Sequence, residues 1–379
     1  KMKVTHVITP INYGGGENLI INLINAMGKN VENSVVNLSC SKEFEKHLDK
    51  AKVKHYRISN KDLGASPSKI QYLLFLILNL FRSFGIGRWV EGDIIHAHGF
   101  PANIFIAFIR KFGLLKGKKL IFTSHSEKKG EKKIVRAFYL FFLKEFDKIT
   151  CVGEKSYNSM IREFPELQDK IVQINNGIKV DSFYYKESDD KIKEYLGYSE
   201  EDIIAIYISR LSSVKNHKFL LELMKEIEIP NFKLLLIGEG EEKERLEQKI
   251  VDYRLQDRVK LQGFVKNEEL VNYYSISDMV LFPSSSEGFG ISIVEGLACR
   301  KPLVLFENIY FRELGTGVLT AKSEEEFISQ TRDLIINKEF RDKMAVEGEK
   351  VRQNLSIEKC AENYEKLYGS LIYGKNINS

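Results

Sequence analysis

Two glutamates lie close together in the segment FPSSSEGFGISIVEG, residues 282–296. Glu287 and Glu295 are eight positions apart, and no other charged residue separates them. The apolar run before the segment predicts a strand and ISIVEGLA predicts the start of a helix, which places Glu287 in a loop and Glu295 about one turn into the helix. A carboxylate can accept two hydrogen bonds from a vicinal diol, which suits ribose or hexose. The alternatives are a solvated loop acid at 287 and an acid favoured by the helix dipole at 295.

Two cations occupy the stretch YISRLSSVKNHKFLLELM, residues 207–224. Arg210 ends a predicted strand, and Lys215 precedes a helix that Asn216 can cap. Ligands of open α/β sheets bind beyond the carboxyl ends of the strands, where both cations are expected. A guanidinium, an ammonium and a helix N-terminus can converge on one anion, and a diphosphate fits best. The alternative is a pair of solvated surface cations.

A glycine turn follows the first predicted strand in TPINYGGGENLIINLINAM, residues 9–27. Glycines at a helix start let a phosphate approach backbone N–H groups, although a plain strand-to-helix turn would look the same. The turn lacks the GxGxxG and GK[ST] patterns, which argues against a nucleotide-binding oxidoreductase.

Short β-rich apolar runs alternate with amphipathic helical runs, which predicts an α/β fold of parallel sheets covered by helices. Two such domains are expected, at 1–180 and 181–356, followed by a segment, 357–379, whose helix can pack back on the N-terminal domain. The predicted strands are 3–9, 34–39, 53–58, 93–98, 119–124, 148–153, 171–176, 203–210, 232–238, 259–264, 279–284 and 301–306.

Taken in order, these motifs resemble glycosyltransferase family 4, retaining sugar transferases of the GT-B fold. The resemblance rests on the glycine turn, NNGI (175–178), R-x4-K, E-x7-E and KPLV (301–304), and it covers nearly the whole chain. It implies two Rossmann-like domains facing an interdomain cleft and a nucleotide-sugar donor, for which we expect UDP. It implies neither a cofactor nor a metal. One departure is ACRKP, where Arg300 stands in place of the usual glycine at a helix end.

The resemblance also implies roles for individual residues. Arg210 and Lys215 match residues that bind the donor diphosphate, Glu295 matches a ribose ligand, and Glu287 lies by the transferred sugar. The residues expected in catalysis are Glu287, Arg210, Lys215 and His125 of TSHS, and those expected at the donor are Gly15, Gly16, Arg210, Lys215, Phe289, Gly290 and Glu295.

The acceptor side is expected to involve Gly16, Glu17 and His98, which ends the predicted strand of DIIHAHG (93–99). A purely structural role is the alternative for His98. We expect His96 and His98 to find partners on opposite faces of the strand, and we therefore predict no metal pair.

The charge is uneven along the chain. Residues 1–180 hold 29 Lys and Arg against 16 Asp and Glu, whereas the remainder holds 28 against 36. This asymmetry predicts that the first half faces an anionic partner. The segment KKGEKKIVRAFYLFFLK, 128–144, resembles an interfacial amphipathic helix, although a core helix after a solvated basic loop is the alternative. The residues expected at the membrane are Lys128, Lys129, Lys132, Lys133, Phe141 and Phe142.

We therefore expect a lipid-linked glycan acceptor, in polysaccharide, lipopolysaccharide or glycan-precursor assembly, and a cytoplasmic enzyme held at the inner face of the cell membrane. No apolar run reaches about 18 residues, and no segment suits a signal peptide. Four cysteines without a CxxC fit a reducing compartment. The alternatives are a soluble GT-B transferase with a small-molecule acceptor and a nucleic-acid-binding protein, but no RNA- or DNA-binding pattern is visible.

Overall fold

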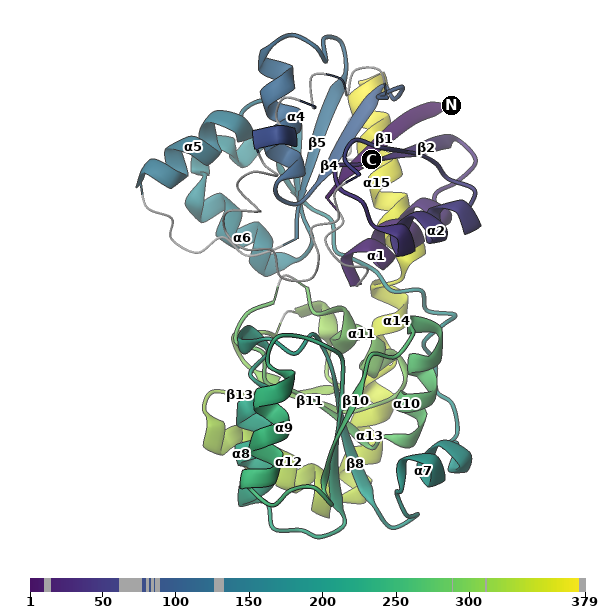
Figure 1. Ribbon diagram of the computed structural model, residues 1–379, viewed down its shortest axis with the longest axis vertical. Helices are drawn as coiled ribbons and strands as arrows, with labels where there is room; N and C mark the ends of the chain where they lie inside the picture. Colours follow the sequence, from purple (N-terminus) through teal and green to yellow (C-terminus); the bar gives the residue numbers. More distant parts are fainter. Residues whose placement is uncertain are drawn as a thin grey trace. The chain divides into compact units, whose positions relative to one another are not determined.

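The computed structural model describes residues 1–9, 15–60, 77–79, 82, 85, 89–125, 133–287, 289–310 and 312–374 (Figure 1). The chain forms two compact units. The first contains Lys1–Gly177 together with Ile357–Ser379, and the second contains Ile178–Ser356.

The first unit is built on a seven-stranded parallel sheet with the order β3-β2-β1-β4-β5-β6-β7. The strands are β1 Met2–Ile8, β2 Val31–Asn37, β3 Lys54–Arg57, β4 Ile94–His98, β5 Lys119–Ser124, β6 Lys148–Cys151 and β7 Ile171–Gln173. The helices are α1 Gly15–Ala26, α2 Lys42–Lys50, α4 Ala102–Lys111, α5 Lys133–Leu143, α6 Glu154–Glu163 and α15 Ile357–Tyr373. All five residues of β4 are buried, as in a parallel sheet covered on both faces.

Helix α15 completes the first unit although it is the last helix of the chain. It packs against α1 and β1, and Glu365 Oε1 accepts a hydrogen bond from the Gly28 amide at 2.5 Å. Tyr364 and Tyr368 are buried on its inner side. The first unit is therefore discontinuous in sequence.

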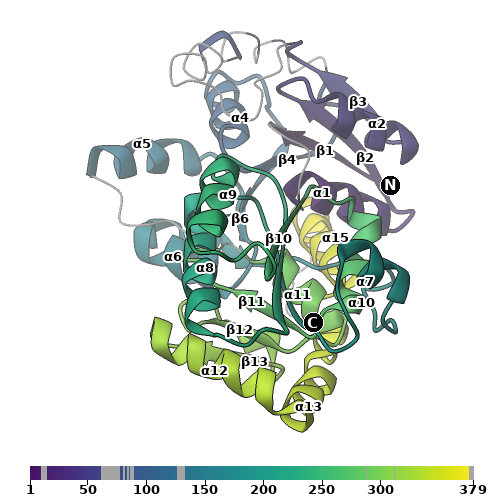
Figure 2. The same cartoon turned by 60° about the horizontal axis from the view of Figure 1, so that its bottom comes forward.

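The second unit contains a six-stranded parallel sheet with the order β10-β9-β8-β11-β12-β13. The strands are β8 Ile203–Ile208, β9 Phe232–Ile237, β10 Val259–Gly263, β11 Met279–Phe282, β12 Leu303–Phe306 and β13 Val318–Ala321. The helices are α7 Asp190–Leu196, α8 His217–Glu226, α9 Lys243–Asp252, α10 Leu270–Ile276, α11 Ile291–Ala298, α12 Glu324–Ile336, α13 Lys338–Gly348 and α14 Val351–Asn354. Helices α8 and α9 cover one face of this sheet, and α10 and α11 cover the other (Figure 2).

These two sheets confirm the predicted architecture of two Rossmann-like domains. Each of the twelve predicted strands is present, within a few residues of its expected bounds, and β13 is an additional edge strand. None of the helices in the described ranges is long and apolar enough to cross a membrane. The four cysteines are free and buried.

Candidate functional site

The strand order of the second sheet reverses between β8 and β11, which are neighbours in the sheet. Ligands of open α/β sheets bind at the carboxyl ends of strands at such a reversal. Arg210 and Lys215 lie in the segment after β8, and Glu287 lies in the segment after β11. The fold therefore brings these two predicted segments to the same edge of one sheet.

Hydrogen bonds join the two segments directly. The amide and the hydroxyl of Ser285 both donate to the Val214 carbonyl oxygen, at 3.0 and 3.1 Å. Lys215 Nζ forms an ion pair with Glu287 Oε1, and the Ser284 hydroxyl donates to that same oxygen at 2.6 Å. A cation and an acid predicted for one ligand are thus in direct contact.

Arg210 has a different partner. Its guanidinium donates to Glu241 Oε2 at 3.1 Å, and both side chains are about half exposed, at 53% and 48%. An ion pair this exposed contributes roughly 0–1 kcal/mol, because water and salt screen it. An anionic ligand can therefore compete for this guanidinium.

Helix α11 begins with a backbone turn that requires glycine. Gly290 has a φ of 73°, and a Cβ there would lie 2.6 Å from Ile293 Cδ1. Phe289 next to it is 5% exposed, whereas Gly288 lies outside the described residues.

Glu295, the second acid of the motif, lies in α11 and is only 5% exposed. Its Oε2 accepts a hydrogen bond from the Tyr274 hydroxyl of α10 at 3.4 Å. Burial raises the pKa of Glu295 to about 7, because the charged form loses its hydration.

Arg300 follows the C-terminal end of α11 with a φ of 57°, the left-handed conformation that glycine adopts readily. Its side chain forms an ion pair with Glu349 at 2.6 Å, and its guanidinium carbon lies 4.9 Å from the Tyr185 ring centroid. The unusual residue at this helix end thus makes two contacts that a glycine would lack.

In the first unit, Gly15 and Gly16 are the first two residues of α1, and Glu17 lies in its first turn. Gly14 lies outside the described residues. His125 directly follows β5, and burial lowers its pKa to about 4. Its ring centroid is 5.8 Å from that of His98 at the end of β4.

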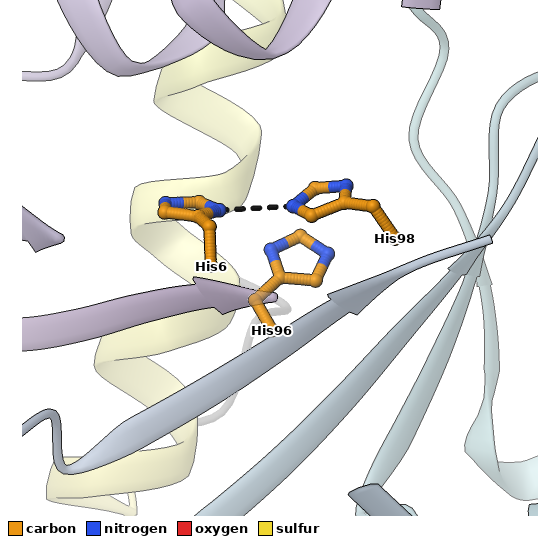
Figure 3. A group of neighbouring side chains, drawn as sticks. All are labelled: His6, His96 and His98. Carbon is orange, nitrogen blue, oxygen red and sulfur yellow. Dashed lines mark hydrogen bonds between the residues drawn. The ribbon is translucent and has the colours of Figure 1, made fainter. Parts of the chain in front are cut away.

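His98 belongs to a buried histidine cluster with His6 and His96 (Figure 3). The expectation that His96 and His98 face opposite sides of the strand is wrong. Residues two apart on a strand share a face, and the two ring centroids are 4.1 Å apart. The sequence analysis also missed His6, which pairs with His96 in the β1–β4 register. The sequence signal that could have identified His6 is its place in the first predicted strand, residues 3–9.

Hydrogen bonds set the proton positions in this cluster. Asn33 Oδ1 accepts from His6 Nε2 at 3.1 Å, so His6 Nδ1 accepts from His98 Nε2 at 2.9 Å. Nδ1 of His98 has no partner among the described residues. Burial lowers the pKa of all three rings, which keeps them neutral.

The three rings of the cluster have nitrogens within 4.8 Å of one another, close enough to consider a metal ion. However, both nitrogens of His96 hold other partners, Tyr368 Oη at 2.8 Å and Thr123 Oγ1 at 2.6 Å. A cation bound by all three rings would have to displace one of these groups. The geometry therefore favours a hydrogen-bonded network that links β4, β5 and α15.

Helix α5 carries part of the predicted membrane segment. Lys133 and Phe141 are exposed, and Lys111 Nζ lies 3.9 Å from the Phe141 ring centroid. Ile134 and Phe138 are also exposed, at 85% and 52%. Phe142 is instead 8% exposed and packs in the core, which corrects its placement at a membrane. Lys128, Lys129 and Lys132 lie outside the described residues.

Family models match both halves of the chain. Residues 13–182 match the model described as Glycosyltransferase Family 4, and residues 188–351 match the model described as Glycosyl transferases group 1. The chain belongs to glycosyltransferase family 4. This glycosyltransferase is 27% identical over 230 residues to alpha-monoglucosyldiacylglycerol synthase of Acholeplasma laidlawii, a match that covers 59% of this chain and 58% of that protein.

A second relative is N-acetyl-alpha-D-glucosaminyl L-malate synthase of Bacillus anthracis, 26% identical over 294 residues, or 74% of this chain and 75% of that protein. Among solved structures, HepE of Anabaena in complex with UDP and glucose superposes with a TM-score of 0.81. That match covers 98% of this chain and 100% of HepE at 19% identity. It confirms the GT-B fold.

Proposed function

We propose that this glycosyltransferase moves a sugar from a UDP-sugar to a glycan acceptor with retention of the anomeric configuration. The observation that supports this most is the contact of Lys215 with Glu287 at the carboxyl ends of β8 and β11. This contact places the Lys215 ammonium, a cation suited to a diphosphate, beside the Glu287 carboxylate, which can accept hydrogen bonds from sugar hydroxyls. The HepE structure, a complex with UDP, supports the choice of nucleotide.

The main predicted residues have proposed roles. Arg210 exchanges its exposed partner Glu241 for the diphosphate, which Lys215 also contacts. Glu295 accepts a hydrogen bond from ribose, and Glu287 one from the transferred sugar. In the first unit, His125, Gly15 and Gly16 are proposed to contact the donor, and Gly16, Glu17 and His98 the acceptor.

In the proposed reaction, the acceptor hydroxyl attacks on the same face of the sugar from which the diphosphate leaves. The acceptor hydroxyl oxygen forms a bond to the anomeric carbon while the bond from that carbon to the diphosphate oxygen breaks. The electron pair of the broken bond stays on the diphosphate, and the acceptor proton passes to a diphosphate oxygen. Arg210 and Lys215 stabilise the charge that develops there, the compensation that a divalent metal would otherwise supply. Glu287 orients the sugar and stabilises positive charge on it, without forming a covalent bond.

Calorimetric titration with UDP, GDP and ADP tests the donor assignment. We expect UDP to bind, and we expect Arg210→Ala to abolish binding because it removes the bidentate anion ligand. Arg245→Ala is the matched control, because Arg245 is an exposed arginine of the same unit that pairs with Glu242. Unchanged UDP affinity in Arg210→Ala would contradict the site. Mass spectrometry of products from a panel of nucleotide sugars identifies the sugar.

We further propose that the acceptor is lipid-linked and that α5 docks on an anionic membrane at the inner, cytoplasmic face. The exposed apolar side chains Ile134, Phe138 and Phe141 lie on a helix that begins with Lys133, a composition suited to a lipid interface. One relative is named alpha-monoglucosyldiacylglycerol synthase, and this name refers to a diacylglycerol lipid. A small-molecule acceptor is the second candidate, favoured by the relative named for L-malate.

Vesicle sedimentation separates these candidates. We expect the chain to bind phosphatidylglycerol vesicles more than phosphatidylcholine vesicles, and Phe138→Ser with Phe141→Ser to release it. Reversal of Lys128, Lys129, Lys132 and Lys133 to Glu should also weaken binding. Ile336→Ser removes an apolar side chain of the second unit that is more exposed, at 76%, than either phenylalanine, and it serves as the control. Vesicle binding unaltered by both sets of changes would remove the membrane proposal.

A further inference from the structure

Two buried hydroxyl groups lie next to the Lys215–Glu287 ion pair. Ser284 follows β11, Tyr207 lies on β8, and both are 0% exposed. The Tyr207 hydroxyl is 3.0 Å from Ser284 Oγ and 3.1 Å from the Lys215 carbonyl oxygen. One hydroxyl thus reaches both of the segments that hold the proposed donor residues.

The tyrosine ring is fixed by its neighbours. Its centroid is 4.9 Å from that of His217 and 5.3 Å from that of Phe282, the latter in an edge-on arrangement. Burial raises the pKa of Tyr207, so its hydroxyl keeps its proton and can donate. A locked ring with a protonated hydroxyl is a rigid support for the groups that it touches.

The direction of the hydrogen bonds follows from the number of protons. Ser284 has one hydroxyl proton and donates it to Glu287 Oε1 at 2.6 Å. Its oxygen can then only accept from Tyr207, whose single proton is shared between Ser284 Oγ and the Lys215 carbonyl oxygen. The chain of bonds therefore runs from Tyr207 through Ser284 to Glu287.

This chain determines which carboxylate oxygen of Glu287 is available. Ser284 and Lys215 both bind Oε1, and no hydrogen bond joins Oε2 to any residue in the described part of the chain. The side chain is 12% exposed. With Oε1 occupied by two donors, Oε2 is the oxygen of Glu287 that remains to accept hydrogen bonds from the sugar.

We propose that Tyr207 and Ser284 are positioning residues for sugar transfer: they hold Glu287 Oε1 against Lys215 and leave Oε2 to accept a hydrogen bond from one hydroxyl of the transferred sugar. This inference rests on the proposed function, since it deepens the role given to Glu287. It commits the donor to a sugar with a free hydroxyl that reaches this oxygen.

Steady-state kinetics of UDP release, with the UDP-sugar that the product panel identifies, provide the test, together with calorimetric UDP affinity. Ser284→Ala should lower kcat about 10- to 100-fold and change the UDP Kd less than about threefold, since its oxygen touches the sugar-binding acid and not the diphosphate ligands. Ser284→Thr retains the hydroxyl and should retain activity. Thr331→Val removes another buried hydroxyl of the same unit, which donates to the Phe327 carbonyl at 2.8 Å, and should leave kcat unchanged.

Tyr207→Phe keeps the ring and removes only the hydroxyl. If Tyr207 acts through Ser284, the double variant with Tyr207→Phe and Ser284→Ala should have the same kcat as Ser284→Ala alone. Independent effects of the two changes on kcat would multiply. Multiplying effects on kcat with unchanged UDP affinity would refute the chain of bonds, because loss of the Tyr207 contact with the Lys215 carbonyl oxygen would instead weaken UDP binding. Equal losses of kcat and UDP affinity would show that the hydroxyls only support the fold.

Glu287→Gln separates this inference from the proposed function. If that variant keeps full kcat, the role proposed for Glu287 is wrong. If it loses kcat while Ser284→Ala and Tyr207→Phe behave like Thr331→Val, only the positioning inference is overturned.

Discussion

Glu295→Gln is the most informative single change, because the burial of Glu295 indicates both the sign and the size of its effect on the free energy of unfolding. The carboxyl group is 5% exposed, and its one polar side-chain partner among the described residues is the Tyr274 hydroxyl at 3.4 Å. Burial raises its pKa from 4.5 to about 7. In the unliganded protein, an ionised Glu295 is therefore a buried charge with little compensation.

The pH dependence of stability follows from this shift. The folded state holds the proton more tightly than the unfolded state, so Glu295 favours folding fully below about pH 4.5. That contribution is lost as the pH rises to about 7 and does not return above it. The shift from 4.5 to about 7, at roughly 1.4 kcal/mol for each pH unit, gives a loss of about 3 kcal/mol. Glutamine cannot ionise and removes this pH dependence.

The assay is urea unfolding followed by circular dichroism, at several pH values between about 5 and 8.5, for the wild type and for Glu295→Gln. We expect the difference in free energy of unfolding to move by about 2.5 kcal/mol toward the variant across this range, because a small part of the loss already occurs below about pH 5. Glu247→Gln, an exposed glutamate on α9, is the control. If the free energies of unfolding of Glu295→Gln and wild type differ by the same amount at every pH, the inferred pKa shift of Glu295 is refuted.

The same variant should bind UDP more weakly, because a carboxylate accepts hydrogen bonds from ribose more strongly than an amide oxygen does. Greater stability with weaker nucleotide affinity is the pattern expected of a residue kept for binding. Calorimetry on the same samples measures this second effect.

Three further changes test the geometry. Gly290→Ala should lower the free energy of unfolding by about 1–3 kcal/mol, because its φ of 73° and the 2.6 Å approach to Ile293 both oppose a Cβ; an unchanged urea midpoint would contradict this. Arg300→Gly should be more stable than Arg300→Ala by about 1 kcal/mol in urea unfolding, because both lose the side-chain contacts but only glycine relieves the left-handed backbone; equal stabilities would show that no strain is present. Tyr368→Phe should cost about 1–3 kcal/mol in thermal unfolding by leaving His96 Nδ1 unpartnered, and a melting temperature equal to the wild type would argue against the network.

The fold was predictable from sequence because buried parallel strands leave a strong apolar signal. The run KLIFTS corresponds to β5, Lys119–Ser124, without any shift in its bounds. β13 was missed because VLTA is a short edge strand whose burial is only partial. Such a segment lacks both a continuous apolar run and a clear alternation.

The candidate site was predictable only in part. Residue type and position after a strand pointed to Lys215 and Glu287, and their contact follows from the neighbouring positions of β8 and β11. The roles of Tyr207 and Ser284 could not be foreseen, because each resembles an ordinary buried residue until the register places their hydroxyls 3.0 Å apart. Phe142 was assigned wrongly to the membrane surface. Its neighbour Phe141 is exposed whereas Phe142 is buried, and composition alone cannot separate the two.

The return of α15 to the first unit affects the order in which the protein can mature on the ribosome. Residues 1–177 are translated well before Tyr364 and Tyr368, whose hydroxyls pair with Thr123 and His96 in the interior of that unit. Until translation reaches α15, His96 Nδ1 lacks its tyrosine partner, and Thr123 Oγ1 has only its partners His96 and Thr150 from within the first 177 residues. The contiguous second unit, Ile178–Ser356, is by contrast complete in sequence before the first unit can close.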